Sequence, residues 1–548
     1  MDTLSGLDAT FLYLETAEMP MHIGSFCLYE LPPDFKGSFH KAVQAHIARR
    51  QHLAPVFSRK LEFMPLDLGH PVWIQVEDID LDFHIRRVKG KTLTFRQAEE
   101  ICAVLHSQLM DRRQPLWELH VFERIERPDG SLCAGLYSKV HHATLDGKGG
   151  TVLTNAIMDL SATPREVPPP GKQRQGSEQH DLKMGEMIGA VFSSSLAQYV
   201  KLIKALPQAA QALGSTVLKQ SFGGPGHKTG IKSPLHLAPM TDFNVAVTTE
   251  RTFGTARLPF ADCRAMAKAV NGSFNDILLW LCATALRTYV SQHGSIPKKS
   301  MLAAMPISLR EEGNKDFNTQ ASMTVVELGT QFANPMKRLK VIMTSTAKVK
   351  NAMVDLKGLL PTDYPSLLAP WIVGGVAKAA FKTYSATGLS HRLPMLANLV
   401  ISNVPGPQVS LYLAGARMLT YYPMSIVVHG VALNITIQTY AGYVDFGVIA
   451  DKKAMPQVHD LTDALMQAFE EGRQLMAQAQ AAAAAATVKP KIALANPGKT
   501  RVNQAKKVAH VTPTKRPASK AGPRVSPVKS KTATVKAVLT QVRKSSRT

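Results

Sequence analysis

The sequence predicts an α/β protein with more than one domain, and three observations support this fold class. The chain has 548 residues, 45% of them hydrophobic, which is enough for two or three domains with buried cores. Residues 132–140 alternate as a strand does, and Val152, Leu153 and Ile157 then recur at helical spacing. A second series of strands and helices begins near Asn244.

Strands and helices are expected to alternate through the first third of the chain. Apolar periodicity predicts helices at 4–14, 39–51 and 94–110 and strands at 21–29 and 115–122. Either Ser5 or Asp8 is expected to cap the first helix. Pro115 leads into the second strand, and Trp117 is expected to be a core side chain in a strand at the edge of the sheet.

The second α/β segment shows the same alternation. Its expected elements are a helix at 277–289, strands at 302–310 and 399–407, a hairpin of 431–440 and 443–449, and a helix at 461–480. Ser273 precedes Asn275 and Asp276, so a helix cap is the simplest interpretation of either polar residue. Ala441-Gly442 is the expected hairpin turn. The polar face of the first hairpin strand carries Asn434, Thr436 and Gln438.

The stretch between the two α/β segments differs in composition. Pro168, Pro169 and Pro170, followed by polar residues, mark a solvated linker. An apolar stripe between 184 and 203 then predicts an amphipathic helix, which either packs on a domain or lies at a lipid interface. We therefore divide the chain into an N-terminal domain (1–163), a linker with crossover helices (164–242), a C-terminal domain (243–477) and a tail (478–548).

Most of the excess positive charge lies in the tail. The whole chain has a formal net charge of +23, but residues 487–548 hold 16 basic residues and no acidic ones. The rest of the chain carries 48 basic and 41 acidic residues. This composition predicts a disordered tail, which either stays solvated or binds an anionic surface such as phospholipid, nucleic acid or polyphosphate.

The remaining composition bears on the cellular compartment. The five cysteines are scattered and lack CxxC spacing, so we expect reduced thiols in a cytosolic protein. The N-terminus shows neither the basic region nor the apolar core of a secretory signal. Two uncharged runs, 393–416 and 418–444, are interrupted by Pro, Asn, Gln and Gly, so they are expected to be buried strands and turns rather than membrane spans.

A histidine pair at the end of the strand at 132–140 is the clearest candidate for chemistry. The motif reads His141-His142-Ala143-Thr144-Leu145-Asp146-Gly147. Asp146-Gly147 is a turn signal, so the pair is expected where the chain leaves a strand and faces a cleft. A neutral imidazole can take a proton from a hydroxyl whose oxygen attacks a carbonyl, which typically contributes a factor of about 10²–10⁴ in rate.

Packing and metal binding are the alternative interpretations of the pair. No HxxxH, HxH or CxxC spacing accompanies it, and adjacent strand residues point to opposite faces, so no metal site is expected. Asp146 either orients an imidazole or pairs with a distant arginine. We favour the arginine, because a short turn points Asp146 back into the protein, where a carboxylate needs a cation.

Several motifs in order resemble the bacterial wax ester synthase/diacylglycerol acyltransferase family. The histidine motif alone is shared with chloramphenicol acetyltransferases, carnitine acyltransferases and peptide-synthetase condensation domains. The resemblance extends over roughly residues 4–477. The other motifs that carry it are Pro115-Leu116-Trp117, Asn275-Asp276, Ser402-Asn403-Val404-Pro405-Gly406-Pro407, Leu433-Asn434-Ile435 and Asp445-Phe446-Gly447.

This resemblance implies a two-domain, CoA-dependent acyltransferase fold like that of chloramphenicol acetyltransferase, with a central channel and the histidine motif at its middle. His142 would be the general base, His141 would help to place it, and Asp146, beside Gly147, would pair with Arg310. Asn275 and Asp276 would support the site. The channel walls would include Pro115, Leu116, Trp117, Ser402, Asn403, Pro405 and Gly406.

The implied reaction moves a long-chain fatty acyl group from acyl-CoA to the hydroxyl of diacylglycerol, of a long-chain alcohol, or of both. The products would be triacylglycerol and wax ester, and no cofactor would be needed. The enzyme would be cytoplasmic and peripherally associated with the inner membrane or lipid droplets. Two alternatives stay open: a carrier-protein-dependent acyltransferase of the same fold, and a non-catalytic protein that binds lipid droplets or nucleic acid.

Overall fold

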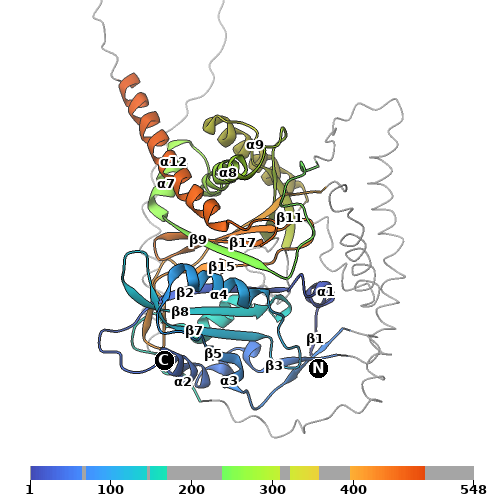
Figure 1. Ribbon diagram of the computed structural model, residues 1–548, viewed down its shortest axis with the longest axis vertical. Helices are drawn as coiled ribbons and strands as arrows, with labels where there is room; N and C mark the ends of the chain where they lie inside the picture. Colours follow the sequence, from blue (N-terminus) through green and yellow to red (C-terminus); the bar gives the residue numbers. More distant parts are fainter. Residues whose placement is uncertain are drawn as a thin grey trace, which may run out of the picture. The chain divides into compact units, whose positions relative to one another are not determined.

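A computed structural model describes residues 2–63, 70–144, 149–169, 237–308, 321–356 and 395–487. These residues form an eight-stranded sheet, a six-stranded sheet and a small three-stranded sheet. Helices α7, α8, α9 and α12 lie on the side of the six-stranded sheet that faces away from the eight-stranded sheet (Figure 1). The architecture is mixed α/β, as the sequence predicts, and has two main sheets.

The N-terminal half contains β1 (Asp2–Thr3), α1 (Gly6–Leu14), β2 (His22–Glu30), α2 (Phe39–Ala48), η1 (Gln51–Leu53), η2 (Pro55–Phe57), β3 (Arg59–Glu62), β4 (Val72–Gln75), α3 (Leu81–His84), β5 (Ile85–Arg87), β6 (Leu93–Thr94), α4 (Phe95–Ser107), β7 (Trp117–Glu126), β8 (Leu132–His141), η4 (His142–Thr144) and α5 (Gly149–Ile157). The expected helices and strands of this half are confirmed, and Ser5 caps α1 by accepting the Asp8 N–H.

The C-terminal half contains β9 (Arg251–Pro259), α7 (Phe260–Ala269), α8 (Phe274–His293), β10 (Leu302–Ser308), β11 (Ala321–Glu327), α9 (Pro335–Leu356), β12 (Leu399–Val404), β13 (Tyr412–Leu413), β14 (Ala416–Met418), β15 (Tyr422–Met424), β16 (Leu433–Tyr440), β17 (Tyr443–Asp451) and α12 (Val458–Thr487). The expected hairpin is confirmed as β16 and β17, and its turn residues have positive φ angles of 46° at Ala441 and 84° at Gly442.

The six-stranded sheet has the order β11-β10-β12-β16-β17-β9 and mixes parallel and antiparallel pairs. Helix α8 packs between this sheet's other helices and is buried along most of its length. β16 is buried on both faces. Asn434, Thr436 and Gln438 therefore form a buried polar face, because β15 packs over β16 and covers it.

The eight-stranded sheet has the order β13-β14-β2-β8-β7-β5, with β15 paired to β2 and β6 paired to β7. The prediction that the strand of Trp117 lies at a sheet edge is wrong, because the short parallel strands β5 and β6 cover that side of β7. Trp117 is nevertheless a core residue. Its ring packs on Phe57 and His84, and its Nε1 donates to the Phe57 carbonyl.

Three strands of the C-terminal half belong to the N-terminal sheet. β14 and β15 both pair antiparallel with β2, and β13 pairs with β14. The sequence division assigned all of 243–477 to one domain, and the structure differs for 412–424. β15 also packs against β17 of the six-stranded sheet, so this segment joins the two sheets (Figure 1).

The C-terminal helix is longer than the sequence division allows. α12 continues to Thr487, so the prediction that the disordered tail starts at 478 is wrong for the first ten residues. Alanine has the highest helix propensity, and the run at 481–486 extends a helix already anchored by the buried residues Leu461, Leu465 and Phe469. The rest of the tail, 488–548, lies outside the described residues, as does the predicted amphipathic stripe at 184–203.

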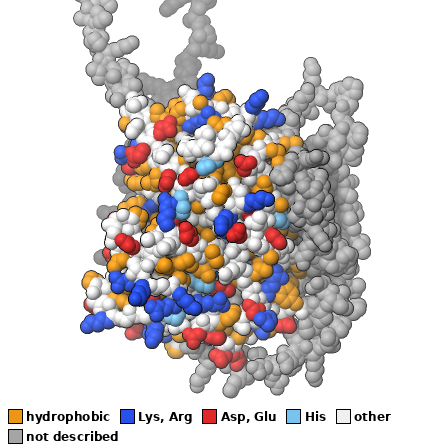
Figure 2. Space-filling model, in the orientation of Figure 1, with side chains coloured by type: hydrophobic (Ala, Val, Ile, Leu, Met, Phe, Trp, Pro, Cys, Tyr) orange, Lys and Arg blue, Asp and Glu red, His pale blue; other side chains and the backbone are white. Residues whose placement is uncertain are grey.

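All five cysteines are free and buried, in agreement with the expectation of reduced thiols. Charged side chains of both signs are interspersed on the face shown in Figure 2, with Lys and Arg gathered in a band across its lower part. None of the helices described is both long enough and apolar enough to cross a bilayer.

Gly447 is predicted to be required for the contact between the two sheets. A Cβ atom at this position would overlap the carbonyl group of Pro423 in β15. We expect Gly447→Ala to lower the free energy of unfolding by about 1–3 kcal/mol, because backbone cannot move aside as a flexible side chain does. Urea unfolding measures this change.

The matched control is Gly294→Ala, whose added Cβ would meet its nearest neighbours at 3.7 and 3.8 Å. An equal effect of the two substitutions would contradict the steric explanation.

Candidate active site

The histidine pair lies at the end of β8, as the sequence predicts. His141 is the last residue of the strand and pairs with His22 of β2 on one side. On the other side its N–H donates to the Leu116 carbonyl at 3.0 Å, just before β7 begins. His142 begins the one-turn helix η4, which packs against α1. Neighbouring strands therefore fix the backbone of the pair from both sides.

Both ring nitrogens of His141 face polar groups inside the protein: Nδ1 makes a hydrogen bond, and Nε2 makes a close contact with a carboxylate. Its side chain is fully buried, and Nδ1 accepts the N–H of Ala143 at 3.1 Å. Because Nδ1 is an acceptor, the ring proton of the neutral form lies on Nε2. That nitrogen is 3.3 Å from Oε1 of Glu15. His141 is thus held in one tautomer and one orientation.

Glu15, the C-cap residue of α1, is a buried carboxylate with several donors. Oε1 accepts the Met21 N–H at 3.0 Å, and Oε2 accepts from Nε and Nη2 of Arg112 at 3.0 and 2.6 Å. Burial by itself raises the pKa of Glu15, but His141, the Met21 N–H and Arg112 outweigh burial and lower the pKa to about 2. Glu15 is therefore an anion at neutral pH.

His142 is held by its backbone and by ring stacking. Its N–H donates to the Met21 carbonyl at 2.9 Å, and its ring stacks on Phe11 of α1 with 3.8 Å between centroids. Nδ1 is buried and has no hydrogen-bond partner among the described residues. Burial, followed by the electrostatic effect of the neighbouring His141, lowers the pKa of His142 to about 4. His142 is thus neutral at physiological pH and able to accept a proton.

A layer of buried polar side chains continues along the same face of β8. Lys139, two residues before His141, is 1% exposed and lies 3.1 Å from Oε2 of Glu118, which also contacts His120 at 3.0 Å. The Lys139 ammonium also donates to the carbonyls of Leu105 and Gln108 at the end of α4. These contacts fix the strand that carries the pair to the helix above it.

The predicted channel motifs reach the site in different ways. Leu116 contacts His141 through its carbonyl, whereas the side chains of Leu116 and Trp117 are buried in the core, as is Pro115.

Asp276 completes a capping box with Ser273 and accepts from Thr346 at 2.7 Å, which confirms the helix-cap interpretation for this residue.

Two predicted asparagines are brought together. Nδ2 of Asn403, in β12, donates to Oδ1 of Asn275, at the start of α8, at 3.4 Å. Oδ1 of Asn403 is buried and has no partner among the described residues. Ser402, the residue before it, pairs with Thr436 of β16.

The turn after β12 requires a glycine. The Gly406 N–H donates to Oγ1 of Thr439 at 3.0 Å, and a Cβ at Gly406 would overlap Gln438 and the Thr439 carbonyl. This close packing explains why Pro405 is followed by glycine. The other predicted site residues, Asp146, Gly147 and Arg310, lie outside the described residues.

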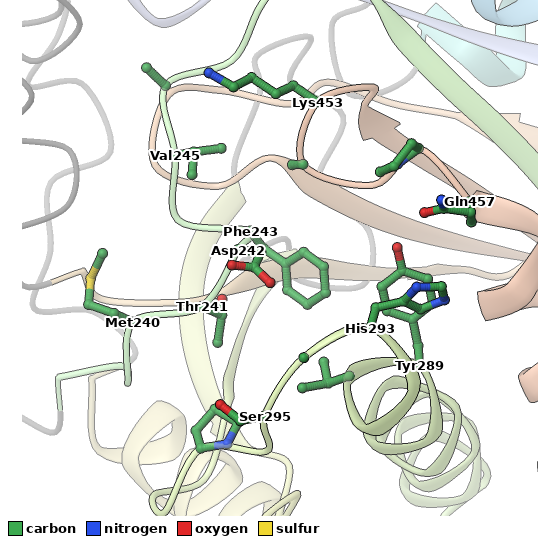
Figure 3. A pocket seen from close by; sticks show the side chains of 16 residues that line it. Met240, Thr241, Asp242, Phe243, Val245, Tyr289, His293, Ser295, Lys453 and Gln457 are labelled. Carbon is green, nitrogen blue, oxygen red and sulfur yellow. The ribbon is translucent and has the colours of Figure 1, made fainter.

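A separate cavity of about 690 Å³ lies in the C-terminal half (Figure 3). Phe243 and Asp242 face it from the segment before β9, Tyr289 and His293 from the end of α8, and Lys453 from the segment after β17. None of the predicted site residues lines this cavity. The described part of the chain also holds no cluster of His, Cys, Asp or Glu suited to a metal ion.

Comparison with known proteins identifies the family of this chain. The profile of the wax ester synthase/diacylglycerol acyltransferase catalytic domain matches residues 4–278, and that of the family's C-terminal domain matches residues 318–472. This chain belongs to that family. It is therefore an acyltransferase, and the fold expected from the resemblance is confirmed.

Two relatives illustrate the likeness. The chain is 29% identical to the O-acyltransferase WSD of Acinetobacter baylyi over 475 residues, which cover 84% of this chain and 94% of that protein. The solved structure of the wax ester synthase/diacylglycerol acyltransferase from Marinobacter aquaeolei VT8 is 25% identical. It superimposes with a TM-score of 0.60 over 87% of this chain and all of that one.

Sequence reasoning missed three residues of the site: Phe11, Glu15 and Arg112. The apolar periodicity of residues 4–14 predicted a helix packed on the first domain, but it did not show which loop the helix would meet. Glu15 and Arg112 are 97 residues apart and read as ordinary surface charges. Only the fold places them beside His141.

The low pKa of His142 predicts an unusual pH dependence of this acyltransferase. A base must be neutral to accept a proton, so kcat/KM should fall as the pH decreases through about 4 rather than through 6.5. Steady-state rates between pH 3.5 and 8 test this, with circular dichroism at each pH to confirm that the protein is folded. An acidic limb near 6.5 would contradict this, because it would show that the ring is solvated in the free enzyme.

Proposed function

We propose that this acyltransferase moves a long-chain fatty acyl group from acyl-CoA to the hydroxyl of diacylglycerol, of a long-chain alcohol, or of both. The donor and acceptor classes are those in the family's name and in its relatives' names. The observation that carries the proposal is a neutral His142 at the end of β8, whose buried Nδ1 is left unpaired by the described residues.

In the proposed mechanism His142 acts as the general base. It takes the proton of the acceptor hydroxyl while that oxygen attacks the thioester carbonyl, and CoA leaves as the thiol. His141 takes no proton in this mechanism, because its ring is fully buried, with Nδ1 occupied by the Ala143 N–H and Nε2 against the Glu15 carboxylate. No cofactor or metal is required.

The remaining predicted residues have supporting parts in this proposal. Asp146 pairs with Arg310 to fix the loop after the histidines, and Gly147 permits its turn. Asn275 and Asn403 contact one another, and the unpaired Oδ1 of Asn403 offers an acceptor to a substrate group. Ser402, Pro405 and Gly406 would line the central channel with the Pro115-Leu116-Trp117 stretch.

Association with lipid follows from the substrates. Diacylglycerol and long-chain alcohols reside in membranes and droplets, so the enzyme must meet them at a lipid surface. We propose a cytoplasmic protein that associates peripherally with the inner membrane or with droplets. The positive charge of the tail would add attraction to anionic phospholipid. Nucleic acid is the alternative ligand of the tail.

The His142→Ala variant tests the base. We expect release of CoA from palmitoyl-CoA by the wild type only when dioleoylglycerol or hexadecanol is present, and the variant should lower kcat by about 10²–10⁴. A thiol reagent follows the release, and the better acceptor identifies the main product.

The control is His293→Ala, which removes an imidazole that pairs with Asp460 and lines the separate cavity. It should keep wild-type activity. Wild-type activity of His142→Ala would show that His142 is not the base. Failure of both acceptors would favour a carrier-protein donor or a non-catalytic role.

A further inference from the structure

The corner between α1 and β2 contacts both histidines. Phe11, in the last turns of α1, stacks on His142, and Glu15, directly after the helix, faces His141. Met21, directly before β2, accepts the His142 N–H through its carbonyl and donates its own N–H to Glu15. One short stretch of chain thus supplies contacts to the rings of both histidines and to the backbone of His142.

Glu15 is at the centre of these contacts. Glu15 is connected to the backbone around His142 through two residues. It contacts His141, which accepts the Ala143 N–H, and it accepts the N–H of Met21, whose carbonyl accepts the His142 N–H. Both Glu15 oxygens are used, so the carboxylate cannot rotate without breaking a contact. A buried anion with this many donors is a rigid anchor.

Arg112 completes the arrangement from the segment between α4 and β7. It donates two hydrogen bonds to Oε2 of Glu15 and one, through Nη2, to the Leu12 carbonyl at 2.9 Å. The guanidinium therefore neutralises the buried carboxylate and also ties down the end of α1, the helix that carries Phe11. Lysine could not reproduce this fork of donors.

We propose that Glu15, held by Arg112, is a positioning residue that fixes His141 in its Nε2-protonated tautomer and thereby orients His142 for catalysis. The inference rests on the proposed role of His142 as the base. It assigns to Glu15 no contact with substrate and no proton transfer. Its effect is on the placement of the catalytic ring, so the rate of the chemical step depends on it more than substrate binding does.

The test compares Glu15→Gln with a matched buried pair elsewhere. Asp159 and Arg50 are each 2% exposed, are joined at 2.9 Å and lie outside the histidine site. We expect Glu15→Gln to lower kcat about 10- to 100-fold with the KM for palmitoyl-CoA nearly unchanged, because only part of the base's contribution of about 10²–10⁴ is lost. Asp159→Asn should keep the wild-type kcat per folded molecule while lowering the melting temperature.

A second comparison separates positioning from general structural support. If Glu15 acts through His141, then Glu15→Gln should cost little further activity in a His141→Gln background. Arg112→Gln should lower kcat in the same direction, and it provides the test if Glu15→Gln does not fold. The proposal is overturned by a wild-type kcat in Glu15→Gln, or in Arg112→Gln where Glu15→Gln does not fold. It is also overturned if the losses from Glu15→Gln and His141→Gln multiply in the double variant.

The outcomes also distinguish this inference from the proposed function. If His142→Ala is inactive and Glu15→Gln is as active as the wild type, the base is correct and the positioning role is wrong. If His142→Ala retains activity, the role of His142 as base fails, and the positioning role of Glu15 fails with it.

Discussion

The antiparallel pairing of β2 with β8 is the constraint on which the site depends. It places His22 opposite His141 and brings the chain immediately before β2 against the residues that follow β8. A shift of one residue in this register would turn His141 away from Glu15, leaving a buried carboxylate without this partner. The register is therefore fixed by polar contacts as well as by the apolar core.

The chemistry follows from the difference between two adjacent imidazoles. His141 is buried, with Nδ1 hydrogen-bonded and Nε2 against the Glu15 carboxylate, whereas His142 sits at the start of a helical turn with its Nδ1 unpaired within the described chain. Burial lowers the pKa of His142 and so keeps it neutral, at the expense of a weaker base. A neutral ring is the form that can accept a hydroxyl proton, and the stack on Phe11 holds it in place.

Much of this could be predicted from local sequence, and the failures have a common physical cause. The alternation before His141 and the cap before Asp276 depend on near neighbours, and both are confirmed. Three features depend on long-range pairing, which periodicity does not encode. They are the interior position of β7 in its sheet, the pairing of residues 412–424 with the N-terminal sheet, and the contacts of His141. The end of α12 was misplaced because alanine suits a helix even where no core remains to bury.

The central claim is that acyl transfer takes place at His142, held by the α1–β2 corner. A crystal structure with a non-hydrolysable palmitoyl-CoA analogue and a long-chain alcohol tests this claim most directly. We expect the alcohol oxygen to lie within hydrogen-bond distance, about 3 Å, of a ring nitrogen of His142, with His141 still facing Glu15. Binding of the analogue at the cavity of Phe243 and Tyr289, with no ligand near His142, would contradict it.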